Sequence, residues 1–187
     1  MFELQPVLTG PLLSLRPLTA ADRDALWAVA KDPLVWEQHP DQTRYVPEGF
    51  AKVFQGAMDS GGALVAVDRE TGHIIGSSRY HDYDKANDVV EVGWTFLARA
   101  YWGGRYNGEM KRLMLTHAFR FVGRVWFKVG PKNLRSQRAV EKIGGLRVGT
   151  GRDGAGRESV VFELTARRFP QLVADGRFGP PPIPRTP

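Results

Sequence analysis

The sequence predicts an α+β fold built around one mixed β-sheet. In the first half, the runs Ala63–Val67, His73–His81 and Val89–Leu97 are rich in β-branched and aromatic residues, and turn-forming stretches separate them. Such short connections predict an antiparallel meander. In the second half, strand-like runs alternate with helix-like runs, which is typical of βαβ units with parallel strands. The two patterns together predict a sheet that contains both kinds of pairing.

The chain before the meander is predicted to hold one short strand and two helices. Leu12–Arg16 has a strand pattern that ends at Pro17. Thr19 is an N-cap residue in front of apolar residues at helical spacing, and Pro47–Met58 carries a proline in its first turn before a second apolar stripe. The segment Pro33–Val46 has no such period, so we expect irregular structure there.

After the meander, apolar residues fall at helical spacing from about Gly104 to Val122. The elements predicted next are the strand Arg124–Val129, a helix from Asn133 to Ile143, a hairpin of Leu146–Gly151 and Ser159–Leu164, and a short helix over Ala166–Ala174. The segment from Phe178 to the end holds five prolines and predicts an extended conformation. We therefore expect a single domain over residues 1–176 and a proline-rich extended tail over residues 177–187.

The composition is that of a globular protein, since 42% of the 187 residues are hydrophobic and 25% are charged. The chain has no cysteine, which excludes disulfides, thiolate zinc sites and a cysteine nucleophile. No apolar run approaches the ~18 residues of a membrane span, and the first residues lack the pattern of a secretory signal. We expect a cytoplasmic protein that binds no membrane.

The formal net charge of +6 is unevenly distributed along the chain. Residues 1–97 contain 8 basic and 14 acidic side chains, whereas residues 98–187 contain 18 basic and 6 acidic ones. This asymmetry predicts two surfaces with different tasks. A basic protein also admits a nucleic-acid partner, but no helix-turn-helix and no interleaved aromatic and basic RNA motif is visible, so we expect none.

The segment Glu91–Glu109 carries the pattern that points most directly to chemistry. A strand ends there, a short loop passes through Gly103 and Gly104, and a helix begins. Backbone N–H groups and the dipole at a helix N-terminus favour phosphate, and glycine lets the backbone approach it closely. An ordinary strand-to-helix turn is the alternative interpretation. One strand later, Asn133 suits a helix N-cap and Ser136 suits a first turn, and neither position requires a ligand.

In their order and spacing, these segments resemble the GNAT superfamily of acyl-CoA-dependent N-acetyltransferases, and most closely its ribosomal-protein-alanine acetyltransferase-like branch. The resemblance covers roughly Leu12 to Arg168. The residues that carry it are Leu13–Leu18, Glu91-Val92-Gly93-Trp94, Trp102-Gly103, Glu109, Asn133, Ser136, Val140, Lys142 and Gly144. The chain departs from the family's pyrophosphate loop, Gln/Arg-x-x-Gly-x-Gly/Ala, because Ala100, Gly103 and Arg105 stand at those three places.

The resemblance implies a GNAT-like three-layer fold with splayed central parallel strands and helices on both faces. It implies acetyl-CoA as co-substrate and transfer of its acetyl group to a primary amine by direct attack in a ternary complex. Backbone groups of the strand end would pair with the pantetheine amides, the glycine loop would hold the pyrophosphate, and Asn133 would meet the pantetheine arm. The implied CoA-binding residues are Phe96, Leu97, Ala98, Trp102, Gly103, Gly104, Arg105, Asn107 and Asn133.

An attacking amine must lose a proton, so the site needs a base. Glu91 matches the strand position of the general-base glutamate in parts of the superfamily, and an ion-paired strand residue is the alternative interpretation. Ser136 matches the residue proposed in this branch to protonate the departing thiolate. Other candidates for proton handling are Glu37, His39, His81, Asp82, Asp84, Tyr101 and Tyr106.

Several alternatives stay open at this stage. The acceptor is either a small amino compound or a protein N-terminus. Arg105 either compensates for the altered loop by binding phosphate or marks weakened CoA binding, and the latter permits a catalytically silent acyl-CoA-binding or sensor domain. The basic half would face CoA and the acidic half a cationic amine. We expect no metal, because the four histidines lack metal-ligand spacing, and the resemblance implies a possible homodimer.

Overall fold

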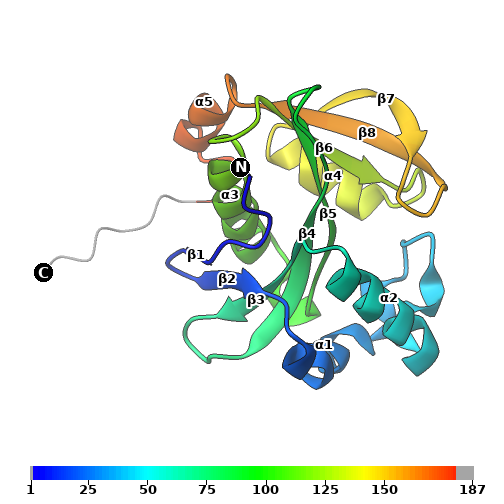
Figure 1. The fold of residues 1–187 in the computed structure, drawn as a ribbon. Coiled ribbons are helices and arrows are strands. Elements are labelled where there is room, and N and C mark those ends of the chain that lie inside the picture. The colour runs from blue at the N-terminus through cyan, green and yellow to red at the C-terminus, as the bar shows by residue number, and fades with distance from the viewer. Residues whose placement is uncertain (1, 180–187) are drawn as a thin grey trace, which may run out of the picture.

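A computed structural model describes residues 2–179 and confirms the α+β prediction (Figure 1). The strands of these residues form one sheet in the order β1-β2-β3-β4-β5-β6-β8-β7, and only β5 and β6 are parallel neighbours. The strands are β1 Leu8–Thr9, β2 Leu13–Pro17, β3 Ala63–Asp68, β4 Ile74–Asp84, β5 Val89–Leu97, β6 Arg124–Val129, β7 Leu146–Arg152 and β8 Glu158–Thr165. The α-helices are α1 Arg23–Ala30, α2 Pro47–Asp59, α3 Arg105–Ala118, α4 Leu134–Lys142 and α5 Phe169–Ala174.

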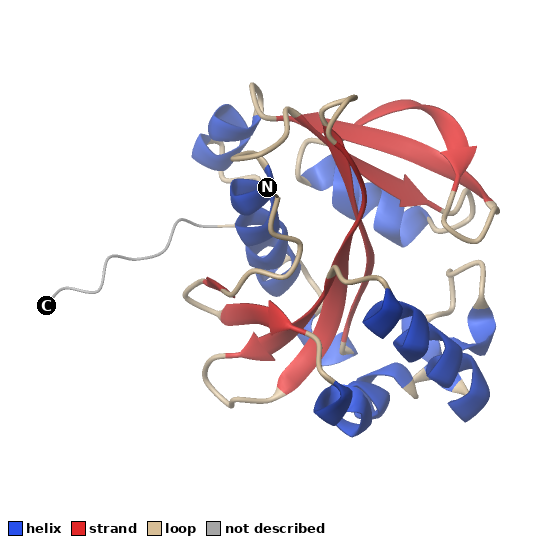
Figure 2. Ribbon diagram, viewed as in Figure 1, coloured by secondary structure: helices blue, strands red, loops and turns tan. Residues whose placement is uncertain are grey.

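Helices cover both faces of the sheet, as predicted. Successive residues of a strand point to opposite faces, and β3 shows the result directly. Leu64 and Ala66 pack in the cluster that contains Met114 of α3, whereas Ala63 and Val65 pack with side chains of α1 and α2. Figure 2 shows α3 on one side of the strands and α1 with α2 on the other. The fold is therefore a three-layer arrangement with an apolar cluster on each side of the sheet.

The segment between α1 and α2, predicted to be irregular, is ordered by two short 3₁₀-helices, η2 Pro33–Val35 and η3 Gln42–Tyr45. An aspartate caps each of them. Asp32 accepts a hydrogen bond from Leu34 N at 3.0 Å, and Asp41 accepts one from Thr43 N at 3.1 Å. These turns are too short to produce an apolar period, so the sequence did not reveal them.

Some element boundaries differ from the predicted ones. The chain enters α1 through the 3₁₀-helix η1 Ala20–Asp22, and α3 ends at Ala118 rather than near Val122. The helix stops because Phe119 leaves the helical conformation, with φ −70° and ψ 0°. α5 begins later than expected, because Pro170 occupies its first turn, where proline is favoured. The sequence analysis missed β1, whose two residues are too few to show alternation.

Phe178, which the sequence analysis assigns to the extended tail, packs against the domain. Its side chain is only 4% exposed, and its ring meets the ring of Phe169 edge to face at 5.4 Å. Its backbone also fits against Gly108 of α3, where a Cβ would lie 2.5 Å from Phe178 O. The packed domain thus extends at least to Phe178. Residues 180–187 of the predicted tail lie outside the described residues.

Candidate active site

The two central parallel strands separate partway along their length. β5 pairs with β6 only over Val89–Glu91, and beyond that point β5 stays with β4 while β6 stays with β8. Within residues 2–179, the β6-facing edge of β5 therefore has no strand partner after Glu91, and Figure 1 shows the two strands diverging there. This confirms the predicted splay. It leaves backbone donors and acceptors available to an extended ligand, much as a sheet edge accepts an added strand.

At the end of β5, the peptide groups of Leu97 face this opening. Leu97 is the register partner of Gly76, but the bond to β4 is made by the next residue, since Ala98 N donates to Ile75 O at 2.8 Å. Because peptide groups alternate between the two neighbours of a strand, those of Leu97 point away from β4. Leu97 O accepts a hydrogen bond from Trp102 Nε1 at 2.9 Å. Of the backbone groups predicted to bind pantetheine, Ala98 N and Leu97 O thus already have partners within the chain.

A β-bulge lies in the middle of β5. Trp94 has a positive φ of 49°, and the β4–β5 register shifts between Ser77 and Arg79. Bulges re-aim side chains and are frequent beside functional sites. Here the bulge brings the Trp94 ring to the side of the sheet that carries Arg79 and His81, at 4.6 Å from the Arg79 guanidinium and 4.6 Å from the His81 ring.

Glu91 lies where the splay begins, and only 3% of it is exposed. Its Oε2 lies 2.8 Å from Lys128 Nζ on β6. Burial raises the pKa of Glu91 above its ordinary value, although the Lys128 ammonium opposes the rise. A raised pKa makes a carboxylate a stronger proton acceptor, and the ion pair fixes its position. Gly93 leaves one side of the carboxylate open, because a Cβ there would lie 3.3 Å from Glu91 Oε1.

His81 is the alternative proton acceptor that the sheet places opposite Glu91, since the two residues are register partners. Burial lowers the pKa of His81, so its imidazole is neutral at pH 7, and its Nε2 lies 3.1 Å from Asp82 Oδ1. Asp84 accepts hydrogen bonds within the β4–β5 turn at 3.0 and 2.6 Å, which is a structural role. Glu37 is exposed.

Asn133 and Ser136 lie at the start of α4. Asn133 is 7% exposed, and its Oδ1 accepts a hydrogen bond from Ser136 N at 3.2 Å, which makes it the helix cap. The Asn133 amide nitrogen and the Ser136 hydroxyl donate to no other group in residues 2–179, so both remain available to a ligand. No hydrogen bond joins Ser136 to Glu91 in this structure.

The loop before α3 exposes several peptide N–H groups. Gly103 and Gly104 have φ values of +102° and +116°, which a side chain would strain. The first hydrogen bond inside α3 runs from Gly108 N to Gly104 O at 2.8 Å. The N–H groups of Arg105–Asn107 therefore have no acceptor within the helix, and no side chain caps them. This is a helix N-terminus at which an anion is favoured.

α4 supplies positive charge to this loop, which the sequence analysis missed. Lys142 Nζ lies 2.9 Å from the position that a Cβ on Gly104 would take. Arg135, on the same helix, holds its guanidinium 4.2 Å from the centre of the Trp102 ring. Residues seven apart lie on one face of a helix, so the spacing of Arg135 and Lys142 could have indicated a cationic face in the sequence. Trp102 is 38% exposed, so this cationic face borders solvent.

Three other residues of this region have structural partners. The hydroxyl groups of Tyr101 and Tyr106 donate to Asp68 at 3.1 and 3.3 Å, and their rings pack edge to face at 4.8 Å. Glu109 is buried, and its Oε1 accepts hydrogen bonds from two backbone N–H groups at the start of β2, at 2.7 and 3.0 Å. The tyrosines are thus held by packing and by Asp68, and Glu109 fastens α3 to β2.

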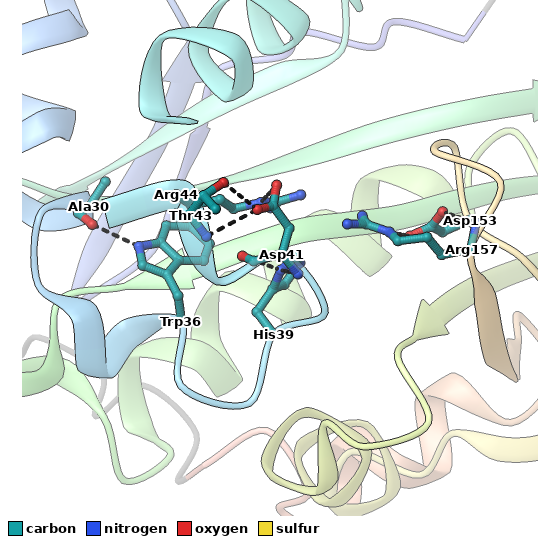
Figure 3. Close-up of polar contacts among 8 residues, drawn as sticks. All are labelled: Ala30, Trp36, His39, Asp41, Thr43, Arg44, Asp153 and Arg157. Carbon is teal, nitrogen blue, oxygen red and sulfur yellow. Dashed lines mark hydrogen bonds and ion pairs between the residues drawn. The ribbon is translucent and has the colours of Figure 1, made fainter. Parts of the chain in front are cut away.

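The segment between α1 and α2 forms a polar cluster around the buried side chain of Trp36 (Figure 3). Trp36 Nε1 donates to Ala30 O at 2.7 Å, and the His39 ring stands edge-on to the Trp36 ring at 5.7 Å. His39 Nδ1 accepts a hydrogen bond from Asp41 N at 2.9 Å. Burial, together with the charge of Arg44, lowers the pKa of His39 to about 4. His39 is therefore a neutral group at pH 7.

A cavity of about 540 Å³ lies between α1 and the start of β4. Ala98 and Arg99 belong to its wall, so it adjoins the loop before α3. Neither Glu91 nor Ser136 lines it, which separates this cavity from the predicted proton chemistry.

Residues 2–179 contain neither a candidate metal site nor a candidate membrane-spanning helix. No cluster of three or more histidine, aspartate or glutamate side chains in this part of the chain is arranged to hold a metal ion. No helix in the same range combines the length and the apolar character needed to cross a membrane.

Comparisons with known proteins agree with this fold. The model of the acetyltransferase (GNAT) domain family matches residues 13–145. A GCN5-related N-acetyltransferase from Brucella melitensis superposes with a TM-score of 0.78 at 20% identity, over 90% of this chain and 82% of the other. RimJ of Mycobacterium smegmatis, in complex with CoA-disulfide, gives 0.66 at 22% identity, over 92% and 94%. The ribosomal-protein-S5-alanine acetyltransferase of Vibrio fischeri gives 0.63 at 16%, over 86% and 97%. No curated protein sequence matches the chain.

Proposed function

The chain belongs to the GNAT acetyltransferase domain family, and we propose that it moves the acetyl group of acetyl-CoA to a primary amine. The observation that best supports this is the course of the splay. It begins at the buried carboxylate of Glu91 and leads along the unpaired edge of β5 to the open N-terminus of α3. A proton acceptor and a binding edge for amides thus follow one another along β5, and an anion site comes next where α3 begins.

The residues present fit the co-substrate. The unpaired edge near Phe96 and Leu97 suits the amides of pantetheine, and the free amide nitrogen of Asn133 suits the same arm. The N–H groups of Gly104, Arg105 and Asn107 at the start of α3 suit the pyrophosphate. In this proposal, Arg105 and Lys142 add charge beside the altered loop, and Trp102 fixes the loop through its bond to Leu97 O.

When bound, acetyl-CoA supplies a thioester carbonyl that a neutral amine attacks directly. Glu91 takes the proton of that amine, directly or through a water molecule, and its raised pKa suits this task. The Ser136 hydroxyl donates a proton to the departing sulfur. Lys128 holds the Glu91 side chain in place through the 2.8 Å ion pair. No covalent intermediate with the protein is needed, so positioning and proton transfer account for catalysis.

The acceptor class is the finer part of the proposal. Proteins of similar fold include a ribosomal-protein-S5-alanine acetyltransferase, which favours testing peptide N-termini alongside small amines. The homodimer implied by the resemblance stays a prediction, to be checked by the mass of the protein in solution.

The test is an assay of thiol release from acetyl-CoA with a panel of amino acids, polyamines and peptides. Glu91→Gln should lower kcat by about 10²- to 10⁴-fold and leave the dissociation constant of CoA unchanged. Glu70→Gln, at an exposed turn, is the matched control and should behave as the wild type. Binding of CoA without thiol release from any amine would instead support the silent binding domain. If acetyl-CoA fails to raise the melting temperature at millimolar concentration, both interpretations are wrong.

A further inference from the structure

Arg79, in the centre of β4, is a buried cation without a polar partner. It is 6% exposed, its Nε makes no hydrogen bond, and its guanidinium forms no ion pair within residues 2–179. Removing a guanidinium from water without compensating bonds is unfavourable, because the charge loses its hydration. Within residues 2–179, the fold therefore leaves the buried Nε of Arg79 without a hydrogen-bond partner.

The Arg79 guanidinium lies over the face of the Trp94 ring. The Arg79 Cζ atom lies 4.6 Å from the centre of the Trp94 ring, which the bulge of β5 turns toward it. A guanidinium stacked on an aromatic ring keeps its N–H donors in its own plane, where they form a fork that matches a carboxylate. The side chain is thus oriented, while its donors stay free.

Two further arginines come close to the same place. Arg44 is 7% exposed and lies 5.4 Å from the centre of the Trp36 ring. Figure 3 shows Arg157, from the loop between β7 and β8, pointing toward the segment that carries Arg44. Burial and the charge of Arg44 lower the pKa of Arg79 to about 10, although the Glu91 carboxylate opposes the shift, so Arg79 remains protonated at pH 7. Arg79 thus keeps its charge beside a second buried arginine.

The nearby carboxylates form their ion pairs with cations other than Arg79, and Glu91 and Asp82 share Lys128. The ion pairs are Asp41 with Arg44 at 3.5 Å, Asp153 with Arg157 at 2.9 Å, Glu91 with Lys128 at 2.8 Å and Asp82 with Lys128 at 3.3 Å. His39 and His81 are neutral at pH 7, since burial lowers the pKa of both. With Arg79, four cations face four carboxylates, and Arg79 is the one of these four cations that forms no ion pair within residues 2–179.

Arg79 shares a face of the sheet with Glu91. Its register partner on β5 is Gly93, two residues from Glu91, so Arg79 and Glu91 are diagonal neighbours. Diagonal neighbours in an antiparallel pair are about 7–8 Å apart, which is within reach of two side chains and one small ligand. If the nitrogen of an amine lies at Glu91, a substituent of the same molecule a few bonds from that nitrogen can reach Arg79.

We propose that the acceptor amine carries a carboxylate, which the Arg79 guanidinium binds while Glu91 receives the proton of the amino group. The inference rests on the proposed acetyl transfer and names its acceptor class. Two sources share this chemistry, a free amino acid through its α-carboxylate and a polypeptide whose first residue is acidic. Residues 1–97 carry a net negative charge, but this sum counts exposed and buried side chains alike. It therefore does not give the local charge around Arg79.

The test compares amines that differ only in the carboxylate. L-alanine is paired with L-alaninamide, and the dipeptide amide Asp-Ala-NH₂ is paired with Asn-Ala-NH₂. Each compound is measured by thiol release from acetyl-CoA and by calorimetric binding to the protein saturated with CoA, which carries no acetyl group. Binding is thereby read independently of turnover.

The wild type should bind the carboxylate member of one pair roughly ten- to a hundredfold more tightly, as expected for hydrogen bonds to a charged group. Arg79→Met, similar in length, should remove that preference through KM with little change in kcat. Arg120→Met removes the same charge at an exposed position and should keep the preference. If Arg79→Met does not fold, the comparison within the wild type decides.

The outcomes separate this inference from the proposed function. Preference within the alanine pair identifies a free amino acid, and preference within the dipeptide pair identifies a polypeptide N-terminus. Equal binding of acid and amide in both pairs overturns the inference, even if thiol is released from every amine. Carboxylate binding that depends on Arg79, without thiol release from any amine, supports the site and contradicts the acetyltransferase proposal.

Discussion

Lys111 of α3 is a buried cation whose replacement should change how stability depends on pH. It is 5% exposed, and its Nζ contacts the hydroxyl groups of Ser78 and Thr95 but no carboxylate within residues 2–179. Burial lowers its pKa from 10.5 to about 7. Lys111→Met keeps the length of the side chain and removes the charge. The two hydroxyl groups stay bonded to each other, since they are 2.8 Å apart.

The magnitude follows from proton linkage. Between pH 7 and about 10.4 the unfolded chain holds a proton at Lys111 that the folded chain has released, so the free energy of unfolding rises with pH. Below pH 7 both states are protonated, and the full cost of the buried charge, on the order of 5 kcal/mol, is present. From pH 7 to pH 9.5 the wild type should regain about 3 kcal/mol, whereas Lys111→Met lacks this contribution.

Urea unfolding of both proteins at pH 6.5, 8 and 9.5 provides the measurement. Subtracting the two free energies cancels every titrating group except Lys111. The advantage of Lys111→Met should be largest at pH 6.5 and should shrink by about 3 kcal/mol by pH 9.5. Lys52→Met, at an exposed position of α2, should show no such trend. A difference that stays constant with pH would refute the reasoning, because it would mean that burial does not depress this pKa.

Four other substitutions test the site and its support. Gly104→Ala strains a residue at φ +116° and places a Cβ 2.9 Å from Lys142 Nζ, so calorimetry should show weaker CoA binding; unchanged affinity would exclude this loop. Lys142→Ala should weaken CoA binding about three- to tenfold and reduce its salt dependence, whereas exposed Lys132→Ala should do neither. Glu109→Ala leaves two backbone N–H groups unpaired and should lower the free energy of unfolding by about 2–4 kcal/mol without changing KM. Phe178→Ala should cost about 3 kcal/mol in urea unfolding, and a negligible loss would show that residue 178 belongs to the tail after all.

The sequence was sufficient for features that depend on short-range order. Val89–Leu97 forms the predicted strand because its β-branched and aromatic residues favour a pleated surface. Asn133 caps α4 and Pro47 opens α2, as local capping chemistry predicted. The paired glycines at 103 and 104 form the turn into α3, because only glycine adopts their positive φ values without strain.

The candidate site was only partly visible in this way. Glu91, Asn133 and the glycine loop were predicted from motifs that resemble a known family. Lys142 was missed as a neighbour of Gly104, since 38 positions separate them and only the packing of α4 brings them together. Arg79 left a signal, since it is a charged residue in the buried stretch 75–80 of β4, but its meaning depends on which groups surround it.

By itself, the sequence determined the kinds of elements, their order and the family to which they belong. These follow from periodicity, capping and turn chemistry, which act over a few residues. Only the tertiary structure decided that Glu91 is buried against Lys128 at the start of the splay, and that Arg79 has no partner of its own. Burial and ion pairing depend on residues that are distant in the chain and meet only in the folded protein. The pKa values and the charge of a site depend on both.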